Sequence, residues 1–109
     1  MTIENFAKQL EFKTLCMPEP EREVEGVYIG DLLSWVMGKA ESGNVWITIM
    51  SNMNIVAVAS LVDVSTILLA ENVELEAEVL KTAESKGINI LSTTLSSYEA
   101  AAKISGALS

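Results

Sequence analysis

The apolar residues of this 109-residue chain change their spacing from segment to segment, and the spacing predicts alternating helices and strands. At the N-terminus apolar residues recur every three or four positions, which predicts a helix over Met1–Gln9. Leu10–Cys16 then alternates apolar and polar residues, as a strand with one buried face does. Pro18 and Pro20 follow, and this pair excludes both a helix interior and a central strand from the next segment.

A second helix is predicted from Asp31 to about Ala40, after a short extended segment at Val27–Ile29. The Asp31 carboxylate can cap this helix by accepting free N–H groups of its first turn, and Gly43 lies just beyond its end. The helix has one apolar stripe that is expected to face the core: Leu32, Leu33, Val36, Met37 and Ala40. The two tryptophans, Trp35 and Trp46, are also expected in the core.

Three later segments, Val45–Ile49, Val64–Ala70 and Ile88–Leu91, are continuous apolar runs. Continuous runs are typical of parallel strands that are covered on both faces, because neither face then meets water. Glu74–Lys86, between the last two strands, has helical periodicity. Its inner side is expected to carry Ala77, Leu80 and Ala83. Ser96 or Ser97 is expected to cap a last helix that ends near Ala107.

Met53–Val62 is ambiguous, because its β-branched residues have high strand propensity. Its two neighbouring strands are expected to be parallel, and parallel strands need a crossover connection that is normally helical. We therefore expect a helix capped by Asn52 or Asn54. This helix is apolar nearly all round, so it must be covered on more than one side. The second cover is either another subunit or the N-terminal segment of the same chain.

The order of these elements predicts an α/β fold: a small three-layer sandwich with a mainly parallel sheet, in one domain over residues 1–109. Half of the residues are apolar, which suits a compact domain or a subunit that also buries an interface. We therefore expect a homodimer in which the Met53–Val62 helix or the Leu32–Ala40 helix supplies apolar contacts. A charge at Val58 is expected to weaken this assembly.

The net charge of −8 argues against nucleic acid or an anionic membrane as a partner, since both would repel the chain. No targeting segment is visible. The apolar stretch Ile47–Ala70 is interrupted by polar residues that are costly in hydrocarbon. The single cysteine, Cys16, has no intramolecular partner and fits a reducing cytoplasm, and a buried, inert thiol is expected there.

The sequence lacks the residues that most enzymes use for catalysis at neutral pH. It has no histidine, which is the usual general base and metal ligand. Gly38-Lys39-Ala40 lacks both the spacing and the hydroxyl residue of a phosphate-binding loop. We therefore expect no enzyme activity, no kinase activity in particular, and neither a cofactor nor a metal.

One group of polar residues is a candidate ligand site, because it follows the expected strands at their carboxyl ends. Neutral hydrogen-bonding groups and one carboxylate gathered there can hold a small polar ligand. The alternative is ordinary capping and turn chemistry, for which the same residue types are common. The candidate residues are Ser51, Asn52, Asn54, Glu71, Asn72, Thr93 and Ser96.

The sequence resembles the DRTGG-domain family over about residues 10–105. The resemblance lies in Gly30-Asp31-Leu32-Leu33-Ser34, Val45-Trp46-Ile47-Thr48-Ile49 and the segments near residues 54–59, 67–71 and 90–99. The signature loops are not kept. Met50–Asn54 stands where Asp-Arg and glycines are expected, and Ala70-Glu71-Asn72 stands where many relatives have Thr-Gly-Gly.

The resemblance implies a domain like the N-terminal domain of HPr kinase/phosphorylase, or like the domain inserted between CBS repeats in some pyrophosphatases. Stand-alone members occur in anaerobic bacteria, some beside components of iron-only hydrogenases. Two functions follow as hypotheses. The first is a non-enzymatic regulatory or dimerisation module that acts on a partner enzyme, in a redox or hydrogenase setting. The alternative is a sensor that binds a nucleotide or another anion at the strand ends.

Overall fold

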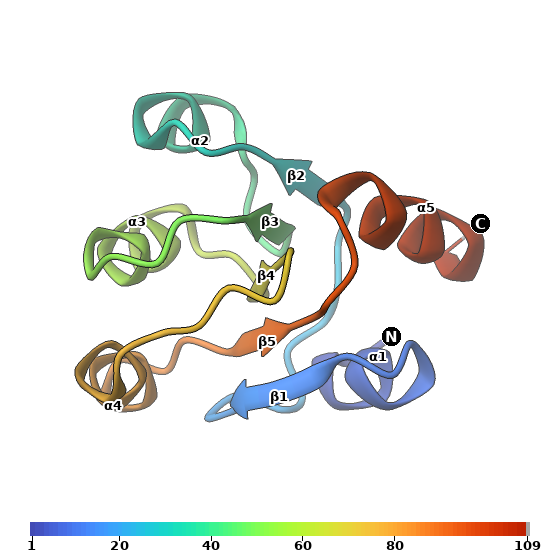
Figure 1. The fold of residues 1–109 in the computed structure, drawn as a ribbon, viewed down its shortest axis with the longest axis horizontal. Helices are drawn as coiled ribbons and strands as arrows, with labels where there is room; N and C mark the ends of the chain where they lie inside the picture. Colours follow the sequence, from blue (N-terminus) through green and yellow to red (C-terminus); the bar gives the residue numbers. More distant parts are fainter. Residues whose placement is uncertain (109) are drawn as a thin grey trace.

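A computed structural model describes residues 1–108 of the chain, which form three layers around a central five-stranded sheet (Figure 1). The strands are β1 (Lys13–Cys16), β2 (Val27–Ile29), β3 (Val45–Thr48), β4 (Thr66–Leu69) and β5 (Ile90–Ser92). The helices are α1 (Ile3–Gln9), α2 (Leu33–Lys39), α3 (Asn54–Val62), α4 (Ala77–Ser85) and α5 (Ser97–Leu108). This confirms the predicted three-layer α/β sandwich.

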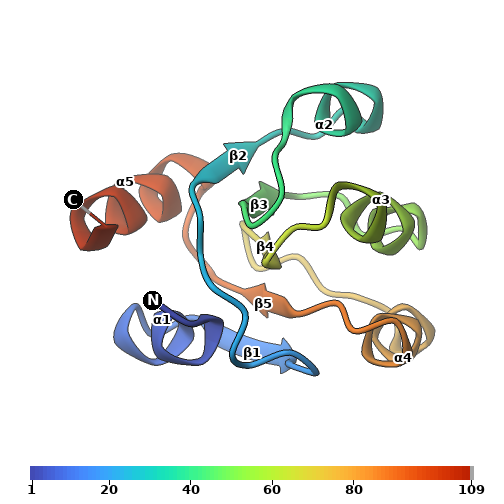
Figure 2. The ribbon, with the colours of Figure 1, turned by 180° about the vertical axis from the view of Figure 1, so that it is seen from behind.

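The sheet winds in one direction. Its order is β1-β5-β4-β3-β2, so β2 to β5 lie side by side in chain order and are all parallel, while β1 pairs antiparallel with β5. The crossover helices α2, α3 and α4 cover one face, and α1 and α5 cover the other (Figures 1 and 2). From β2 to β5 the chain therefore adds each new strand on the same side of the previous one. Among residues 1–108 the strand order has no switch point of the kind that opens a ligand crevice in doubly wound folds.

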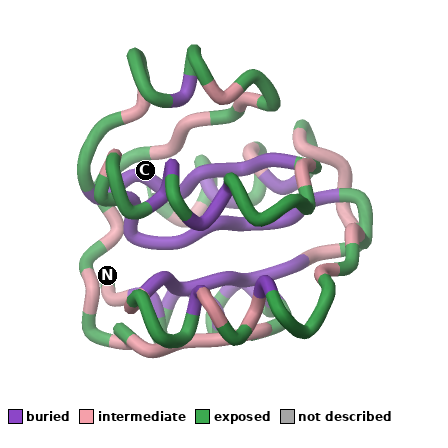
Figure 3. The backbone as a smooth tube through the Cα atoms, turned by 90° about the vertical axis from the view of Figure 1, so that its left-hand side faces the viewer, coloured by how far each residue is buried: buried purple, intermediate pink, exposed green. Residues whose placement is uncertain are grey.

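Each face of the sheet has its own apolar core, because alternate strand residues point to opposite faces. The core under α2, α3 and α4 contains, from the strands, Trp46, Ile67, Leu69 and Ile90. The core under α1 and α5 contains Val45, Ile47, Leu68 and Leu91. Figure 3 shows burial concentrated along the central strands and the inner sides of the helices. Burying one Val, Leu or Ile side chain completely stabilises the fold by roughly 1.5–3 kcal/mol. A strand covered on both faces buries every side chain of a continuous apolar run, so these runs are most stable as central strands.

The ambiguous segment is helix α3, as the topological argument predicted. It lies between α2 and α4, so its second cover comes from neighbouring helices of the same chain (Figure 1). The N-terminal segment lies on the opposite face of the sheet and does not cover it. Val58 is only 7% exposed and belongs to the core, whereas Leu61 is 71% exposed. The outward residue of α3 is therefore Leu61 rather than Val58.

Helix α2 differs most from the prediction. Asp31 does not cap it: the residue before the helix is Leu32, and no side chain caps the first turn. The Asp31 Oδ1 atom instead accepts hydrogen bonds from the Thr48 hydroxyl (2.7 Å) and the Ile49 N–H (2.9 Å). Asp31 thus ties the start of α2 to the end of β3.

The apolar stripe of α2 is also only partly buried. Val36 is fully buried, but Leu32 and Met37 are exposed. Trp35, expected in the core, is 57% exposed, while Trp46 is fully buried as predicted. The reason is position: α2 covers the edge of the sheet near β2, so α3 packs against one of its sides and no helix of residues 1–108 covers the other (Figure 1).

Two smaller predictions were wrong at the ends of elements. Leu10 ends α1, and Glu11 has a left-handed backbone (φ 58°), so strand β1 begins only at Lys13. In α4 Val79 and Ala83 are buried in the core and Leu80 packs against it, so Leu80 and Ala83 were predicted correctly, whereas Ala77 is exposed.

Candidate functional site

The predicted site residues do lie at the carboxyl ends of the parallel strands, but they separate into two groups. Ser51 and Asn52 follow β3 and line a cleft that also reaches the start of α4. Glu71, Asn72 and Thr93 belong to loops after β4 and β5 that bind each other. The seven candidates therefore do not form one pocket.

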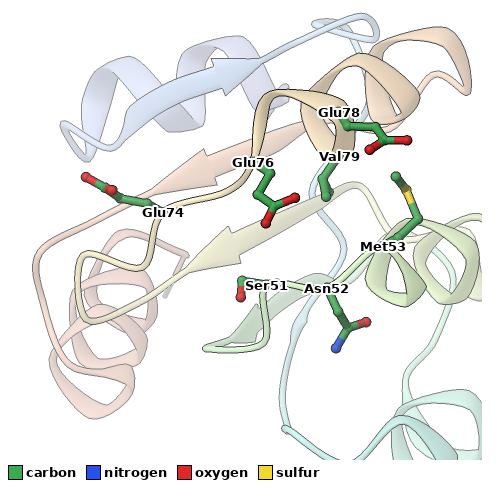
Figure 4. A pocket seen from close by; sticks show the side chains of 7 residues that line it. All are labelled: Ser51, Asn52, Met53, Glu74, Glu76, Glu78 and Val79. Carbon is green, nitrogen blue, oxygen red and sulfur yellow. The ribbon is translucent and has the colours of Figure 1, made fainter.

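The cleft has a volume of about 620 Å³ and is lined by Ser51, Asn52, Met53, Glu74, Glu76, Glu78 and Val79. In Figure 4 the Glu76 carboxylate is directed toward Ser51 and Asn52, and Glu74 points away from them. The lining contains three carboxylates and no lysine or arginine. Three negative carboxylates at one site repel an anion, so this cleft is poorly suited to a phosphate or nucleotide.

Asn52 organises the start of α3. Its Oδ1 atom accepts the N–H of Asn54 (2.9 Å), and its backbone oxygen accepts the N–H of Ile55 (3.2 Å). Asn54 is the first residue of the helix, is exposed, and is not among the residues that line the cleft. Of the two capping candidates, Asn52 therefore supports the helix start.

Glu71 and Asn72 form a backbone clasp between two loops. Both have left-handed backbone, with φ of 60° and 56°. Their N–H groups donate to the carbonyl oxygens of Leu95 and Thr93, each at 2.8 Å. The Thr93 hydroxyl oxygen accepts the Leu95 N–H (3.2 Å). These residues shape the loops, which agrees with the capping-and-turn alternative.

The clasp lies where the family resemblance leads us to expect glycines. The two left-handed positions are those where Thr-Gly-Gly is expected in the family, and glycine adopts positive φ without steric cost. This chain keeps the left-handed conformation with Glu71 and Asn72 instead. A non-glycine residue other than Asn or Asp pays roughly 1–2 kcal/mol for that conformation.

Ser96 and Glu99 cap α5 reciprocally, as predicted for Ser96. The Ser96 hydroxyl oxygen accepts the Glu99 N–H (3.1 Å), and a Glu99 carboxylate oxygen accepts the Ser96 N–H (3.0 Å). The hydrogen bond from the Ser96 N–H, followed by that involving its side chain, lowers the pKa of Glu99. Ser96 is therefore committed to the helix start.

A cluster that the sequence did not predict lies at the opposite end of the parallel strands, where β3 and β4 begin. Asp63 ends α3 in left-handed backbone (φ 70°). Its carboxylate accepts hydrogen bonds from the Ser42 hydroxyl (2.6 Å) and from Arg22 Nη1 (2.9 Å), and Arg22 Nη2 binds its carbonyl oxygen (2.7 Å). The bond from Ser42, then that from Arg22, lowers the pKa of Asp63. The contacts join segments up to 41 residues apart, so local spacing gave no signal of them.

Cys16 is half-buried and its thiol donates to the carbonyl oxygen of Ile88 (3.3 Å). Burial, and then the negative charge of Glu84, raise its pKa to about 11. Because the thiolate is the reactive form, this environment fits the expected inert thiol. Over residues 1–108 no cluster of His, Cys, Asp or Glu could hold a metal ion.

The outer surface of α2 is a second feature that the sequence analysis did not predict. We define the α2 face as Leu32, Trp35 and Lys39, all exposed. The Lys39 ammonium lies 4.3 Å from the centre of the Trp35 ring. Exposed apolar side chains that lie together on one surface are typical of interaction sites.

The fold and these surfaces define a sequentially wound α/β/α domain with a candidate interaction face. The model of the DRTGG domain family matches residues 1–107, and the chain belongs to that family.

A solved structure of similar fold is that of the CBS and DRTGG domains of the regulatory region of Clostridium perfringens pyrophosphatase, complexed with the activator diadenosine tetraphosphate. The two chains are 16% identical and superpose with a TM-score of 0.73 over 94% of this chain. This chain spans 45% of the length of that one. No curated protein matches the sequence. None of the helices in the part of the chain described has both the length and the apolar character needed to cross a bilayer.

Proposed function

We propose that this chain is a non-enzymatic regulatory or dimerisation module that acts by binding a partner enzyme. The observation that carries the proposal is the α2 face, an exposed apolar surface built around Trp35. Apolar side chains that stay in water cost free energy, which binding to a partner recovers.

The proposal includes a homodimer, which the resemblance to the N-terminal domain of HPr kinase/phosphorylase also suggests. Stand-alone members beside hydrogenase components suggest a redox or hydrogenase partner in the cytoplasm. The unpaired Cys16 is compatible with that reducing compartment.

The proposal is tested by co-expressing the tagged chain with enzymes encoded next to it, hydrogenase components first. We expect a complex of fixed stoichiometry and a change in the partner's activity on adding the chain. The chain alone should neither hydrolyse ATP nor phosphorylate a protein serine. Magnesium-dependent phosphoryl transfer by the purified chain would contradict the non-enzymatic role. An unchanged partner with no complex would contradict the regulatory role toward that enzyme.

A second candidate function is a small-molecule sensor at the strand ends. The cleft of about 620 Å³ has the size of a ligand pocket, and the similar pyrophosphatase region was solved with a nucleotide activator. The three glutamates of the cleft oppose an anionic ligand. Calorimetric titration with diadenosine tetraphosphate separates the two functions, and we expect no binding. Saturable binding that is lost in Ser51→Val, but not in the exposed control Ser60→Val, would favour the sensor.

A further inference from the structure

We infer that the free edge of β2 is a docking site for an extended segment of a partner protein. The segment adds to the sheet as a further strand and places alternate apolar side chains in the groove between β2 and α5. The inference rests on the proposed binding of a partner enzyme and names the part of the partner that this chain recognises. The groove lies on the face of the sheet opposite α2, so it can be tested separately from the α2 face.

The outer edge of β2 has backbone groups without a protein partner. Neighbouring residues of a strand bond alternately to one side and to the other. The Gly26 carbonyl oxygen (2.9 Å) and the Gly30 N–H (3.1 Å) both bond to β3, so by alternation Tyr28 faces β3 too. The N–H and C=O groups of Val27 and Ile29 therefore point away from the sheet, and within residues 1–108 nothing bonds to them. Another extended backbone is the partner that satisfies such a row of groups.

An apolar groove of about 540 Å³ lies beside this edge, between β2 and α5 (Figures 1 and 2). Val27 and Ile29 line it from the strand, and Ala101, Ile104 and Leu108 line it from the helix. Ile29 is 45% exposed and Leu108 is 42% exposed. Residues of an added strand that lie opposite Val27 and Ile29 point to the same face of the sheet. Every second side chain of that strand therefore enters the groove.

The two edges of the sheet differ in how they are protected. Natural edge strands carry charges, bulges or prolines that prevent other strands from pairing with them. Strand β1 has a lysine, Lys13, and an irregular register between Thr14 and Cys16. Strand β2 consists of Val27, Tyr28 and Ile29, which pair regularly with β3 and include neither a charge nor a proline. The edge at β2 is therefore the one that can accept another strand.

Charge indicates which segment fits this edge. Glu25 precedes β2 and Asp31 follows it, and both are exposed in a chain with a net charge of −8. A strand that extends past both ends of β2 meets these two carboxylates, so basic residues at its ends are favoured. The occupant that we infer is thus an extended segment with alternating apolar and polar residues and a lysine or arginine at each end.

The test uses the capped peptide Lys-Val-Thr-Val-Thr-Val-Lys, which has this pattern, and amide NMR spectra of the ¹⁵N-labelled chain. In the free chain we expect fast amide exchange at Val27 and Ile29 and slow exchange at Tyr28, because only Tyr28 faces β3. The peptide should half-saturate the chain below about 1 mM. At that point exchange at Val27 and Ile29 should be slower by about two-fold or more. The amides of residues 101–108 should shift, and the Trp35 indole signal should not.

Matched changes in the peptide and in the chain test the two sources of recognition. Replacing both peptide lysines by glutamate should weaken binding at least about three-fold, because Glu25 and Asp31 then repel the peptide. Ile29→Asn should weaken binding at least about five-fold by removing apolar contact. Ile49→Asn is the control and should not change binding, because Ile49 is equally exposed (46%) but follows β3. If Ile29→Asn does not fold by circular dichroism, Leu108→Asn replaces it.

The possible failures are distinguishable. If the peptide neither slows exchange nor causes shifts at Val27 and Ile29, the inference is wrong, and binding through the α2 face is not affected. Slow exchange at these two amides in the free chain that is lost on dilution would make the occupant a second copy and overturn the partner segment. A complex with a partner enzyme that Ile29→Asn leaves intact overturns the groove alone. The absence of any complex contradicts the proposed function toward that enzyme instead.

Discussion

Asn89 gives the sharpest test of how the fold is held together, because its side chain is buried and makes three hydrogen bonds. The residue is 2% exposed and lies immediately before β5. Its Nδ2 donates to the carbonyl oxygens of Glu19 (2.8 Å) and Ser65 (3.0 Å), and its Oδ1 accepts the Glu19 N–H (2.9 Å). One amide thus fixes the loop after β1 against the starts of β4 and β5.

The substitution Asn89→Asp keeps the shape but replaces two donors by an acceptor. Both carbonyl oxygens lose their partner, at about 1–3 kcal/mol for each buried group, and a carboxylate would lie against them. We expect a loss of about 3–5 kcal/mol at pH 7, a large share of the 5–15 kcal/mol typical of a domain. The new carboxyl should have a folded pKa above its unfolded value of about 3.9. The destabilisation that comes from ionising this carboxyl is therefore absent below its unfolded pKa. It grows as the pH rises from the unfolded pKa to the folded pKa.

Urea unfolding at pH 7 and pH 5 measures both effects. The difference from wild type should narrow by at least about 1 kcal/mol at pH 5. Asn54→Asp makes the same chemical change at an exposed position and should alter stability by less than about 0.5 kcal/mol. If Asn89→Asp unfolds within about 0.5 kcal/mol of wild type, or if its deficit does not depend on pH, the reasoning about the buried amide is wrong.

The other predictions concern three side chains. Glu71→Gly should leave stability unchanged or raise it by about 1 kcal/mol, because it relieves a left-handed residue; a loss above 1 kcal/mol in urea unfolding would contradict the strain. Asp63→Asn should cost about 0.5–1 kcal/mol at pH 7, a modest value because the carboxylate is largely exposed. The Asp63 pKa is lowered, so its contribution is present above the unfolded pKa near 3.9 and disappears as the pH falls through the folded pKa. An equal deficit at pH 7 and pH 3 would show that the charge is not responsible. Cys16, with a pKa of about 11, should react with iodoacetamide at pH 8 far more slowly than a free thiol; reaction at the free-thiol rate would place it in a different environment.

The sequence predicted those parts of the fold that depend on what each segment buries. The continuous runs in β3 and β4 became central strands, and topology assigned α3 correctly although its β-branched residues favoured a strand. Helical periodicity does not say which neighbour covers each flank of a helix. For this reason Trp35 was wrongly predicted to lie in the core.

The candidate site was predicted less well, for a related reason. The sequence predicted that the candidate residues follow the carboxyl ends of the parallel strands, and Ser51, Asn52 and Glu71 do lie there. Whether their side chains point into a common space depends on loop conformation. The left-handed backbone at Glu71 and Asn72 directs their N–H groups to a neighbouring loop, and nothing in their spacing indicates it.

The one-directional winding of the sheet has a consequence for the order in which the chain folds. From β2 to β5 each strand pairs with the next one in sequence, so these contacts close comparatively short loops. Strand β1 is different, because Lys13 pairs with Ser92 across almost the whole chain. Within this sequence, residues 1–26 are synthesised before the rest, yet β1 has no partner until β5 exists. The segment that is made first is therefore the last to join the sheet, and amide exchange during folding should show protection at β1 after protection at β3 and β4.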